Sequence, residues 1–238
     1  MEYCKKELLK SLRSGLYLLS LISVLSGCMS VRPMAELQYT DGAVVESLSS
    51  NVSLSSVISG HGITGSGVLM FRKPDQIRAV ILAPFGSVLQ EVYVQGEDVS
   101  IIDTGNGTAF HGSYKDLPEK STISGWRSIY WLIDIDPPEF SRRTTVIERT
   151  NRYGHLEKAA FKNGLLISKT TADGESVWYN RYTAVKGVAF PLEIIYKTVA
   201  NEKFTIQFEE PEINIPLADD VFSVNLNKFC VYPLSVLR

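Results

Sequence analysis

The chain has 238 residues, of which 45% are hydrophobic and 21% are charged, with 24 basic residues set against 26 acidic ones. This length can bury a sizeable core, and the composition is that of an ordinary globular protein. The formal net charge of −2 argues against nucleic-acid binding, which needs a basic surface that neutralises phosphates.

The first 27 residues have the features of a secretory signal peptide. Four basic residues within the first 13 are followed by an uncharged, mostly apolar run over residues 16–25 and then by small residues. The apolar run is about half as long as the ~20 residues that span a bilayer, so it would be a poor permanent anchor. Residues 1–27 are therefore predicted to be a signal peptide that is removed.

Cys28 closes the motif Leu25-Ser-Gly-Cys28, which resembles the lipobox of bacterial lipoproteins. The resemblance implies that Cys28 is acylated and becomes the first mature residue, because only a thiol forms the thioether to diacylglycerol. The alternative is an amphipathic helix that happens to end in Cys, but the order of basic, apolar and small segments favours the lipobox. Lipid on Cys28 would anchor the chain stably, since each buried methylene contributes ~0.8 kcal/mol. Met29 stands where inner-membrane lipoproteins typically have Asp, so the expected location is the outer membrane, facing the periplasm.

Removal of the signal peptide changes the charge and the cysteine content. Four basic and two acidic residues are lost, which leaves 20 basic and 24 acidic residues and a formal net charge of −4. Cys4 is lost and Cys28 carries lipid, so Cys230 has no partner for an intramolecular disulfide. We expect Cys230 to be buried and inert.

The mature chain is predicted to consist of a lipidated tether over residues 28–40 and a single domain over residues 41–238. Asp41 can cap a short helix over residues 42–48. After it, alternating apolar and polar residues separated by turn residues predict a continuous antiparallel meander. The expected strands are residues 52–59, 63–72, 76–83, 88–95, 99–103, 108–112, 144–149, 155–161, 165–171, 177–183, 192–199 and 203–209.

One segment breaks this pattern and is predicted to be a helix over Ser121–Asp136, ended by Pro137 and Pro138. Asp134 and Asp136 at its end are expected to be solvated. Its apolar residues cover most of the circumference, so the helix must be covered on both sides or face an apolar phase. It is either a core helix packed on the sheet or a lid over an apolar cavity. The residues that would form such a lid are Trp126, Ile129, Tyr130, Trp131, Leu132 and Ile133.

No group of residues in the sequence predicts catalysis, a cofactor or a metal site. Gly60-His-Gly62-Ile-Thr-Gly65 matches the dinucleotide fingerprint, but strand-like residues follow it where that motif needs a helix. Such glycines, together with Gly67, are more typical of a bent strand beneath close-packed neighbours. The three histidines lack ligand spacing, and there is no Gly-x-Ser-x-Gly nucleophile motif. We therefore expect a protein that is not an enzyme.

Pro84, Phe85 and Gly86 lie between two strand-like runs, residues 77–82 and 88–94. Pro presets φ and Gly permits a positive φ, so these residues form a turn with Phe85 near its tip. Phe85 either folds back into the core or stays exposed for contact with a membrane. Burial of one Phe contributes only about 1.5–3 kcal/mol, so an exposed Phe85 would serve local contact rather than attachment.

These features together resemble the LolB-like outer-membrane lipoprotein receptors, whose periplasmic carrier relatives, the LolA proteins, share their fold. The strand–Pro84–Phe85–Gly86–strand arrangement is similar to a receptor loop with an exposed Leu that inserts into the membrane during lipoprotein transfer. Phe85 departs from that Leu in type but keeps its apolar character. The segment Trp126–Ile133 before Pro137, and Gly187–Pro191 before two strands, are also similar to the family. The resemblance covers about residues 50–224.

This resemblance implies a mainly β fold with a few helices: an incomplete, strongly curved antiparallel β-barrel of about eleven strands, with helices over an apolar cavity that receives acyl chains. It implies a receptor that accepts acylated lipoproteins from a LolA-like periplasmic carrier and inserts them into the outer membrane, where it also touches lipid. The protein would need no cofactor and would act as a monomer. The alternative is a lipid-anchored envelope lipoprotein that binds another apolar ligand or an assembly partner without transfer activity.

Overall fold

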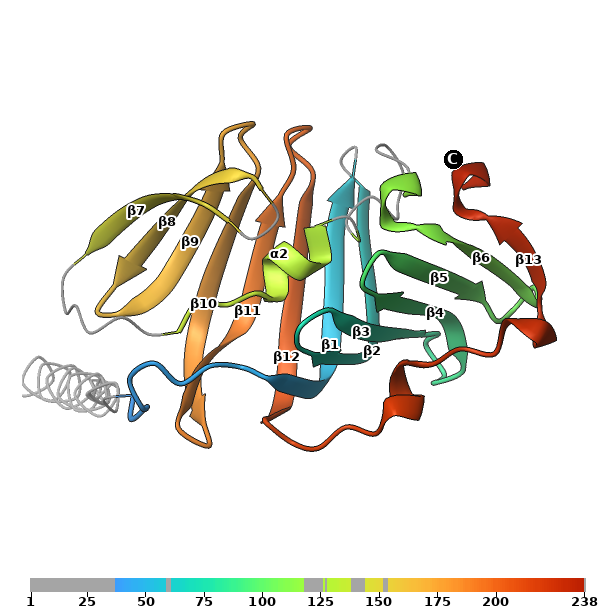
Figure 1. Ribbon diagram of the computed structural model, residues 1–238, viewed down its shortest axis with the longest axis horizontal. Coiled ribbons are helices and arrows are strands. Elements are labelled where there is room, and N and C mark those ends of the chain that lie inside the picture. The colour runs from blue at the N-terminus through green and yellow to red at the C-terminus, as the bar shows by residue number, and fades with distance from the viewer. Residues whose placement is uncertain are drawn as a thin grey trace, which may run out of the picture. The chain divides into compact units, whose positions relative to one another are not determined.

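The computed structural model describes residues 37–58, 61–117, 126, 128–137, 144–151 and 154–237. One open sheet of thirteen strands makes up most of this part of the chain (Figure 1). Leu37–Arg238 forms one compact unit. The strands are β1 (Ser47–Ile58), β2 (His61–Arg72), β3 (Gln76–Leu82), β4 (Val88–Gln95), β5 (Asp98–Asp103), β6 (Thr108–Ser113), β7 (Thr145–Thr150), β8 (Leu156–Lys162), β9 (Leu165–Thr171), β10 (Ser176–Val185), β11 (Val188–Lys197), β12 (Lys203–Ile213) and β13 (Cys230–Pro233).

The strands follow one another in space almost as they do in sequence. β1 lies in the middle of the sheet, with β2 to β6 extending in order on one side and β12 to β7 in reverse order on the other. Neighbouring strands are antiparallel, except that β13 pairs in parallel with β6 at one edge. β7 forms the other edge, so the sheet is open and not a closed barrel. The antiparallel meander predicted from the turns is confirmed.

The connection from β6 to β7 carries the chain from one side of the sheet to the other. It contains the 3-10 helix η1 (Tyr114–Asp116) and the α-helix α2 (Ile129–Ile133). α2 lies across one face of the sheet, which we call the inner face (Figure 1). A helix of five residues has little stability of its own, so α2 is held by its packing.

Alternation along the strands places the main hydrophobic core on the inner face. Ile206 and Phe208 of β12 lie opposite Leu54 and Val52 of β1, and all four belong to this core. The residues between them point to the opposite, outer face, because side chains alternate along a strand. The largest fully buried side chains of the core include Phe71, Phe161, Tyr179, Phe190 and Ile194.

A smaller core lies on the outer face beneath the C-terminal segment. It contains Tyr93, Ile102 and Ala109, packed against Val224, Leu226 and Phe229. Arg72 holds the start of this segment: its Nη1 donates to Leu217 O at 2.7 Å, and its Nη2 pairs with Asp219 at 2.7 Å. The segment contains the 3-10 helices η3 (Asp219–Phe222) and η4 (Leu226–Lys228), and η5 (Leu234–Val236) follows β13.

Three predictions from the sequence are wrong in detail. The helix expected over residues 42–48 is absent, because Leu48 pairs with Phe71 and Ile213 inside the sheet and β1 already begins at Ser47. The sheet has thirteen strands in its described residues instead of about eleven, and the short β13 was not foreseen. Cys230 is exposed rather than buried, because it begins an edge strand whose residues are all exposed.

The helix expected over Ser121–Asp136 is shorter than predicted within its described part. Only Ile129–Ile133 is α-helical, and Trp126 and Ser128 have 3-10 conformation. Residues 118–125 and 127 lie outside the described residues. None of the helices in the described ranges has the length and apolar character needed to cross a membrane.

The predicted signal peptide, Cys28 and residues 28–36 of the tether also lie outside the described residues. Cleavage before Cys28 and its lipidation therefore stay predictions. Residues 37–40 are irregular chain that leads into the sheet.

Candidate functional site

Exposed apolar side chains gather at one end of the sheet. Val57 at the end of β1 lies beside Lys203 at the start of β12, and Leu82 at the end of β3 lies beside Ser66 of β2. This register brings the β1–β2, β3–β4 and β11–β12 connections to the same end. We call this end the apolar rim, and its exposed apolar residues are Val57, Ile63, Phe85, Val88, Leu89 and Val199.

Phe85 is the most exposed of these residues, with 100% of its surface accessible. Its turn is closed by two backbone hydrogen bonds, from Gly86 N to Ala83 O and from Ala83 N to Ser87 O, both 2.8 Å long. Gly86 has φ +82°, which only glycine adopts without strain. The turn therefore presents Phe85 to the outside instead of folding it back into the core.

Two segments of the rim carry no charge, whereas its β11–β12 connection contains Glu202 and is followed by Lys203. Ser47–Phe71 and Ala79–Gln90 contain no Asp, Glu, Lys or Arg, although 21% of the whole chain is charged. The turns at the opposite end of the sheet, in contrast, contain Lys73, Asp75, Glu97, Lys162 and Lys186. Uncharged surface with exposed apolar side chains loses little when it leaves water, so the rim suits contact with an apolar phase.

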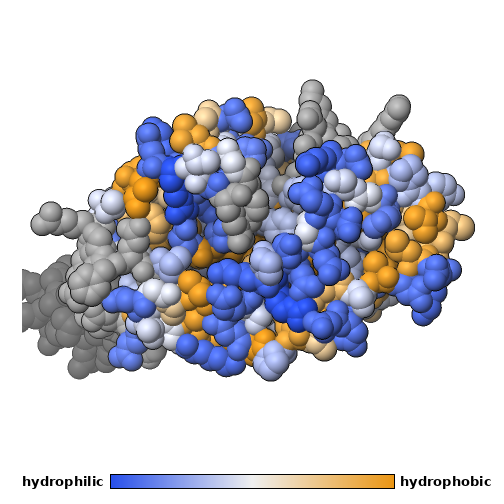
Figure 2. Space-filling view, in the orientation of Figure 1, coloured by the Kyte–Doolittle hydropathy of each residue, from blue (hydrophilic) through white to orange (hydrophobic). Residues whose placement is uncertain are grey.

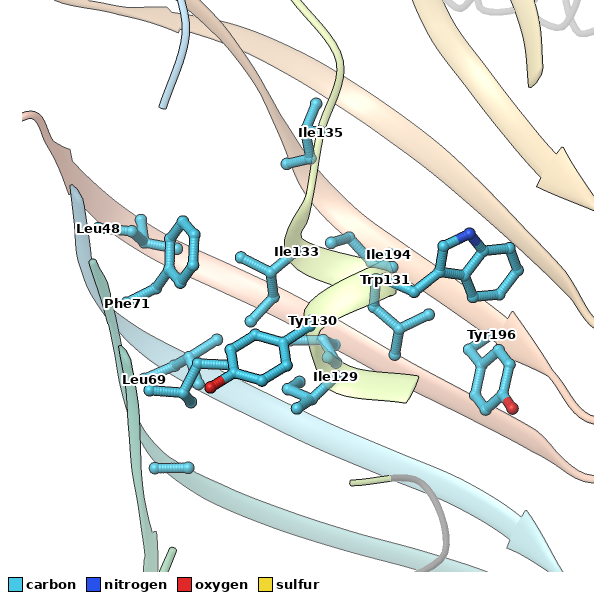
Figure 3. Packing of buried hydrophobic residues seen from close by; sticks show 14 of the residues in the cluster. Leu48, Leu69, Phe71, Ile129, Tyr130, Trp131, Ile133, Ile135, Ile194 and Tyr196 are labelled. Atoms are coloured by element: carbon cyan, nitrogen blue, oxygen red, sulfur yellow. The ribbon is translucent and has the colours of Figure 1, made fainter. Parts of the chain in front are cut away.

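The residues predicted to form a lid lie on the inner face, where they are part of the packed hydrophobic core. Every side chain of α2 is buried, and Trp126 packs against the same core from a partly buried position. Figure 3 shows Tyr130 pointing toward the side of Leu69 and Phe71, and Trp131 pointing toward Tyr196. In Figure 2 the hydrophobic residues visible on this face form separate groups rather than one continuous patch.

One hollow between α2 and the sheet is small. Trp126 and Ile129 border a hollow of about 20 Å³ with residues of β1, β2, β3 and β12, which include Leu54 and Ile206. That volume holds about one water molecule. Acyl chains could reach these strands only if α2 moved away, so the cavity implied by the resemblance stays a prediction.

A buried polar cluster, which the sequence did not reveal, fixes α2 to the sheet. Lys169 is 1% exposed, and its Nζ donates to Trp131 O at 2.8 Å and to Asp134 O at 2.6 Å. Trp131 Nε1 in turn donates to Glu157, also 1% exposed, at 2.6 Å. Arg149 completes the cluster by pairing with Glu157 at 2.8 Å and with Asp136 at 2.6 Å. We call these side chains the Lys169 cluster.

The Lys169 cluster shifts the protonation of its members. Burial lowers the pKa of Lys169, although the charges of Asp136, Asp134 and Glu157 act in the opposite direction. Burial alone would raise the pKa of Glu157, but hydrogen bonds from Trp131 and Arg149 and the charge of Lys169 together hold it below its ordinary value. Glu157 is thus held in its charged form by Trp131, Arg149 and Lys169, whereas the charged form of Lys169 is favoured by the three carboxylates and opposed by the charge of Arg149.

The lowered pKa of Glu157 predicts a loss of stability in acid. Below the ordinary carboxyl value of 4.5 the unfolded chain binds a proton that the folded chain does not, so the free energy of unfolding falls as the pH drops through this window. Replacing Glu157 by Gln should make that fall shallower. Urea unfolding between pH 3 and 7 measures it, and equal slopes for the two proteins would assign the acid loss to other carboxyls.

The prediction that Asp134 and Asp136 are solvated is wrong for Asp136, which pairs with Arg149. A signal for the cluster does exist in the strands. Lys169 lies opposite Ala159, which is fully buried, so its side chain lies on the side of β9 that faces the core. A charged residue on that side needs buried partners. Which residues these are depends on the pairing of β9 with β8, which cannot be derived from either segment alone.

Several solved structures have a similar arrangement of strands and identify the type of fold. A DUF1329-family protein from Desulfovibrio piger has a TM-score of 0.58 and 15% identity, over 76% of this chain and 90% of that one. A LolA-superfamily protein from Nitrosomonas europaea has a TM-score of 0.53 and 13% identity, over 76% and 92%. A domain designated an outer-membrane lipoprotein-sorting protein, from Vibrio parahaemolyticus, has a TM-score of 0.50 and 8% identity, over 74% and 88%. No protein-family model and no curated protein sequence matches the chain. Its open, curved, mainly β sheet is therefore a LolA-like fold.

Proposed function

We propose that this protein is a lipid-anchored, non-enzymatic receptor that accepts acylated lipoproteins from a periplasmic carrier and inserts them into the outer membrane. The LolA-like fold supports binding of lipoproteins or other hydrophobic ligands, and a lipoprotein-sorting domain is among the similar structures. The single observation that carries the insertion step is Phe85, fully exposed at the tip of an uncharged turn.

In this proposal the inner face receives the acyl chains of the cargo. The chains take the place of the apolar side chains of α2, against the same strands that Ile129 and Trp126 now cover. The strands keep their apolar cover in this exchange, because one set of hydrocarbon contacts replaces another. The Lys169 cluster opposes this movement of α2, because the hydrogen bonds from Lys169 to the backbone of α2 must break before the helix leaves the sheet.

The position of the tether determines how the domain would lie on the membrane. Tyr39 donates to Asn163 O at 3.2 Å and Thr40 N donates to Gly187 O at 2.8 Å, so this segment meets the sheet at the end opposite the apolar rim. β1 has 12 residues and a length of about 40 Å. Residues 28–36 reach at most about 32 Å when fully extended. Both Cys28 and Phe85 therefore touch one bilayer only when the strands are tilted away from the bilayer normal.

Replacing Phe85 by Glu tests the insertion step. A charge at the tip of the turn opposes entry into the bilayer, so the variant should accept lipoproteins from the carrier but transfer less than a tenth of the normal amount into outer-membrane vesicles. Because Phe85 contacts no core residue, its unfolding transition should match that of the unchanged protein.

The matched control is Val146→Glu, which changes an exposed apolar residue that lies on the edge strand β7, away from the rim. This variant should insert cargo normally. Equal insertion by the Phe85 and Val146 variants would contradict the role of the turn. In cells, depletion of the protein should leave lipoproteins on the periplasmic carrier, and normal sorting after depletion would contradict the receptor function.

A second candidate function is supported by the small space beneath α2, about 20 Å³. A lipid-anchored envelope protein that binds another apolar ligand or an assembly partner needs no acyl cavity. Mass spectrometry of lipids extracted from the purified protein separates the two functions. Bound free lipid, with no uptake of lipoprotein from a carrier, would favour this second function.

A further inference from the structure

The outer face carries a hollow of about 430 Å³ beside the apolar rim. β1, β2, β12 and the beginning of the β3–β4 turn form its walls, and we call it the outer hollow. Ser53, Ser55, Thr64, Ser66 and Gln207 supply polar groups, and Leu82 and Pro84 supply apolar surface. Two of these groups are already engaged with carboxylates, since Ser53 donates to Glu209 at 2.9 Å and Gln207 donates to Glu193 at 3.3 Å. Ser55 and Ser66 point outward because they alternate with residues of the inner face, such as Leu54 and Gly67.

The chemistry of the outer hollow favours an uncharged ligand. None of the described residues that line it is charged, and the hydroxyl groups of Ser55, Thr64 and Ser66 have no side-chain hydrogen-bond partner in the part of the chain that the structure describes. A phosphate or carboxylate placed there would lack a counter-charge. Free hydroxyl groups instead suit ester carbonyls and glycerol oxygens, which both accept hydrogen bonds.

The size and position of the outer hollow further restrict the kinds of ligand that it could bind. Its volume falls within the range of about 300–1,000 Å³ that is usual for small-molecule sites, and it equals about fourteen water volumes of ~30 Å³. That is room for a glycerol backbone with two ester groups. Pro84 forms part of the wall, and the next residue is the fully exposed Phe85. A ligand seated here therefore has an apolar path directly beside it.

We propose that the outer hollow binds the glycerol-ester region of one diacyl lipid, whose acyl chains extend past Phe85. The direction of the chains rests on the proposed contact of the rim with a bilayer, whereas the binding of the ester region does not. The same chemistry occurs in a bilayer phospholipid and in the diacylglyceryl group of an acylated cysteine on a cargo protein.

Photo-crosslinking of the full chain, purified in detergent, tests the site. The probe is dioctanoylglycerol with a photoactivatable group on one acyl chain, and the labelled peptides are identified by mass spectrometry. Label is expected on β1, β2 and the β3–β4 turn. Ser55→Tyr fills the hollow and should reduce labelling at least fivefold, and Asn51→Tyr, on the same face of β1 but outside the hollow, should not. Equal labelling of the two variants, or label confined to other strands, would overturn the proposal.

Competition identifies the source of the lipid. Stronger competition by phosphatidylethanolamine assigns the hollow to a bilayer lipid, and stronger competition by a diacylglyceryl-cysteine peptide assigns it to the cargo. Competition by neither overturns the site. Depletion keeps the two proposals apart: normal lipoprotein sorting after depletion, together with reduced labelling of Ser55→Tyr, would refute the receptor function and retain the lipid site.

Discussion

Replacing Gly67 by Ala is expected to lower the free energy of unfolding by about 3 kcal/mol, the upper part of the range for added volume in a packed region. A Cβ at this position would lie far inside van der Waals contact with the carbonyl oxygen of Val80, on the neighbouring strand β3. A backbone atom within a sheet cannot rotate away as a side chain can. β2 and β3 would have to separate, and these strands support both the turn of Phe85 and the outer hollow.

Gly65 provides the matched control, two residues earlier on the same strand. A Cβ there meets nothing within 4 Å, so Gly65→Ala should change the stability by less than about 1 kcal/mol, in the stabilising direction. Urea unfolding followed by tryptophan fluorescence measures both variants. If Gly67→Ala unfolds within 1 kcal/mol of Gly65→Ala, β2 does not need glycine for its close approach to β3.

The glycine pattern illustrates what the sequence could and could not predict. Glycines at 60, 62, 65 and 67 predicted a bent or bulged strand beneath close-packed neighbours, and β2 confirms the strand from His61 on. Gly60 lies outside the described residues. Only Gly67 is crowded, and Gly62 and Gly65 face open space. The difference depends on where β3 passes, which is a long-range property that no local pattern contains.

The same dependence on long-range contacts explains which parts of the candidate site could be predicted. The turn of Phe85 could be predicted because Pro and Gly act locally, and the strands because alternation is local. The Lys169 cluster and the outer hollow could not, because each is assembled from strands that pair across long stretches of sequence, such as β1 with β12. Within its described residues, the helix predicted over Ser121–Asp136 was overestimated for a related reason. An apolar run predicts burial, and tertiary packing decided how much of it became helical.

Lys169→Met is the second variant with a large expected effect. The ammonium of Lys169 is the donor for Trp131 O and Asp134 O at the end of α2, and it lies 5.7 Å from the centre of the Trp131 ring. Met keeps the aliphatic part of the side chain but leaves both carbonyl groups without this donor. It also removes a charge that stabilises Glu157. Breaking one partner out of a buried ionic cluster typically costs 3–5 kcal/mol, and because Arg149 remains beside Glu157 we expect about 3 kcal/mol.

The measurement pairs urea unfolding with tryptophan fluorescence, in which the contribution of Trp131 should shift toward that of exposed tryptophan as α2 loosens. Lys158→Met is the control: Lys158 lies on β8 next to Glu157 in sequence, but its ion pair with Glu148 is exposed, with both side chains more than 60% accessible. Exposed pairs contribute little, so this variant should unfold like the unchanged protein. In the proposed receptor, Lys169→Met should also accept cargo faster, because α2 leaves the inner face more easily. A Lys169 variant as stable as the Lys158 variant, with unchanged fluorescence, would show that hydrophobic packing alone holds α2 in place.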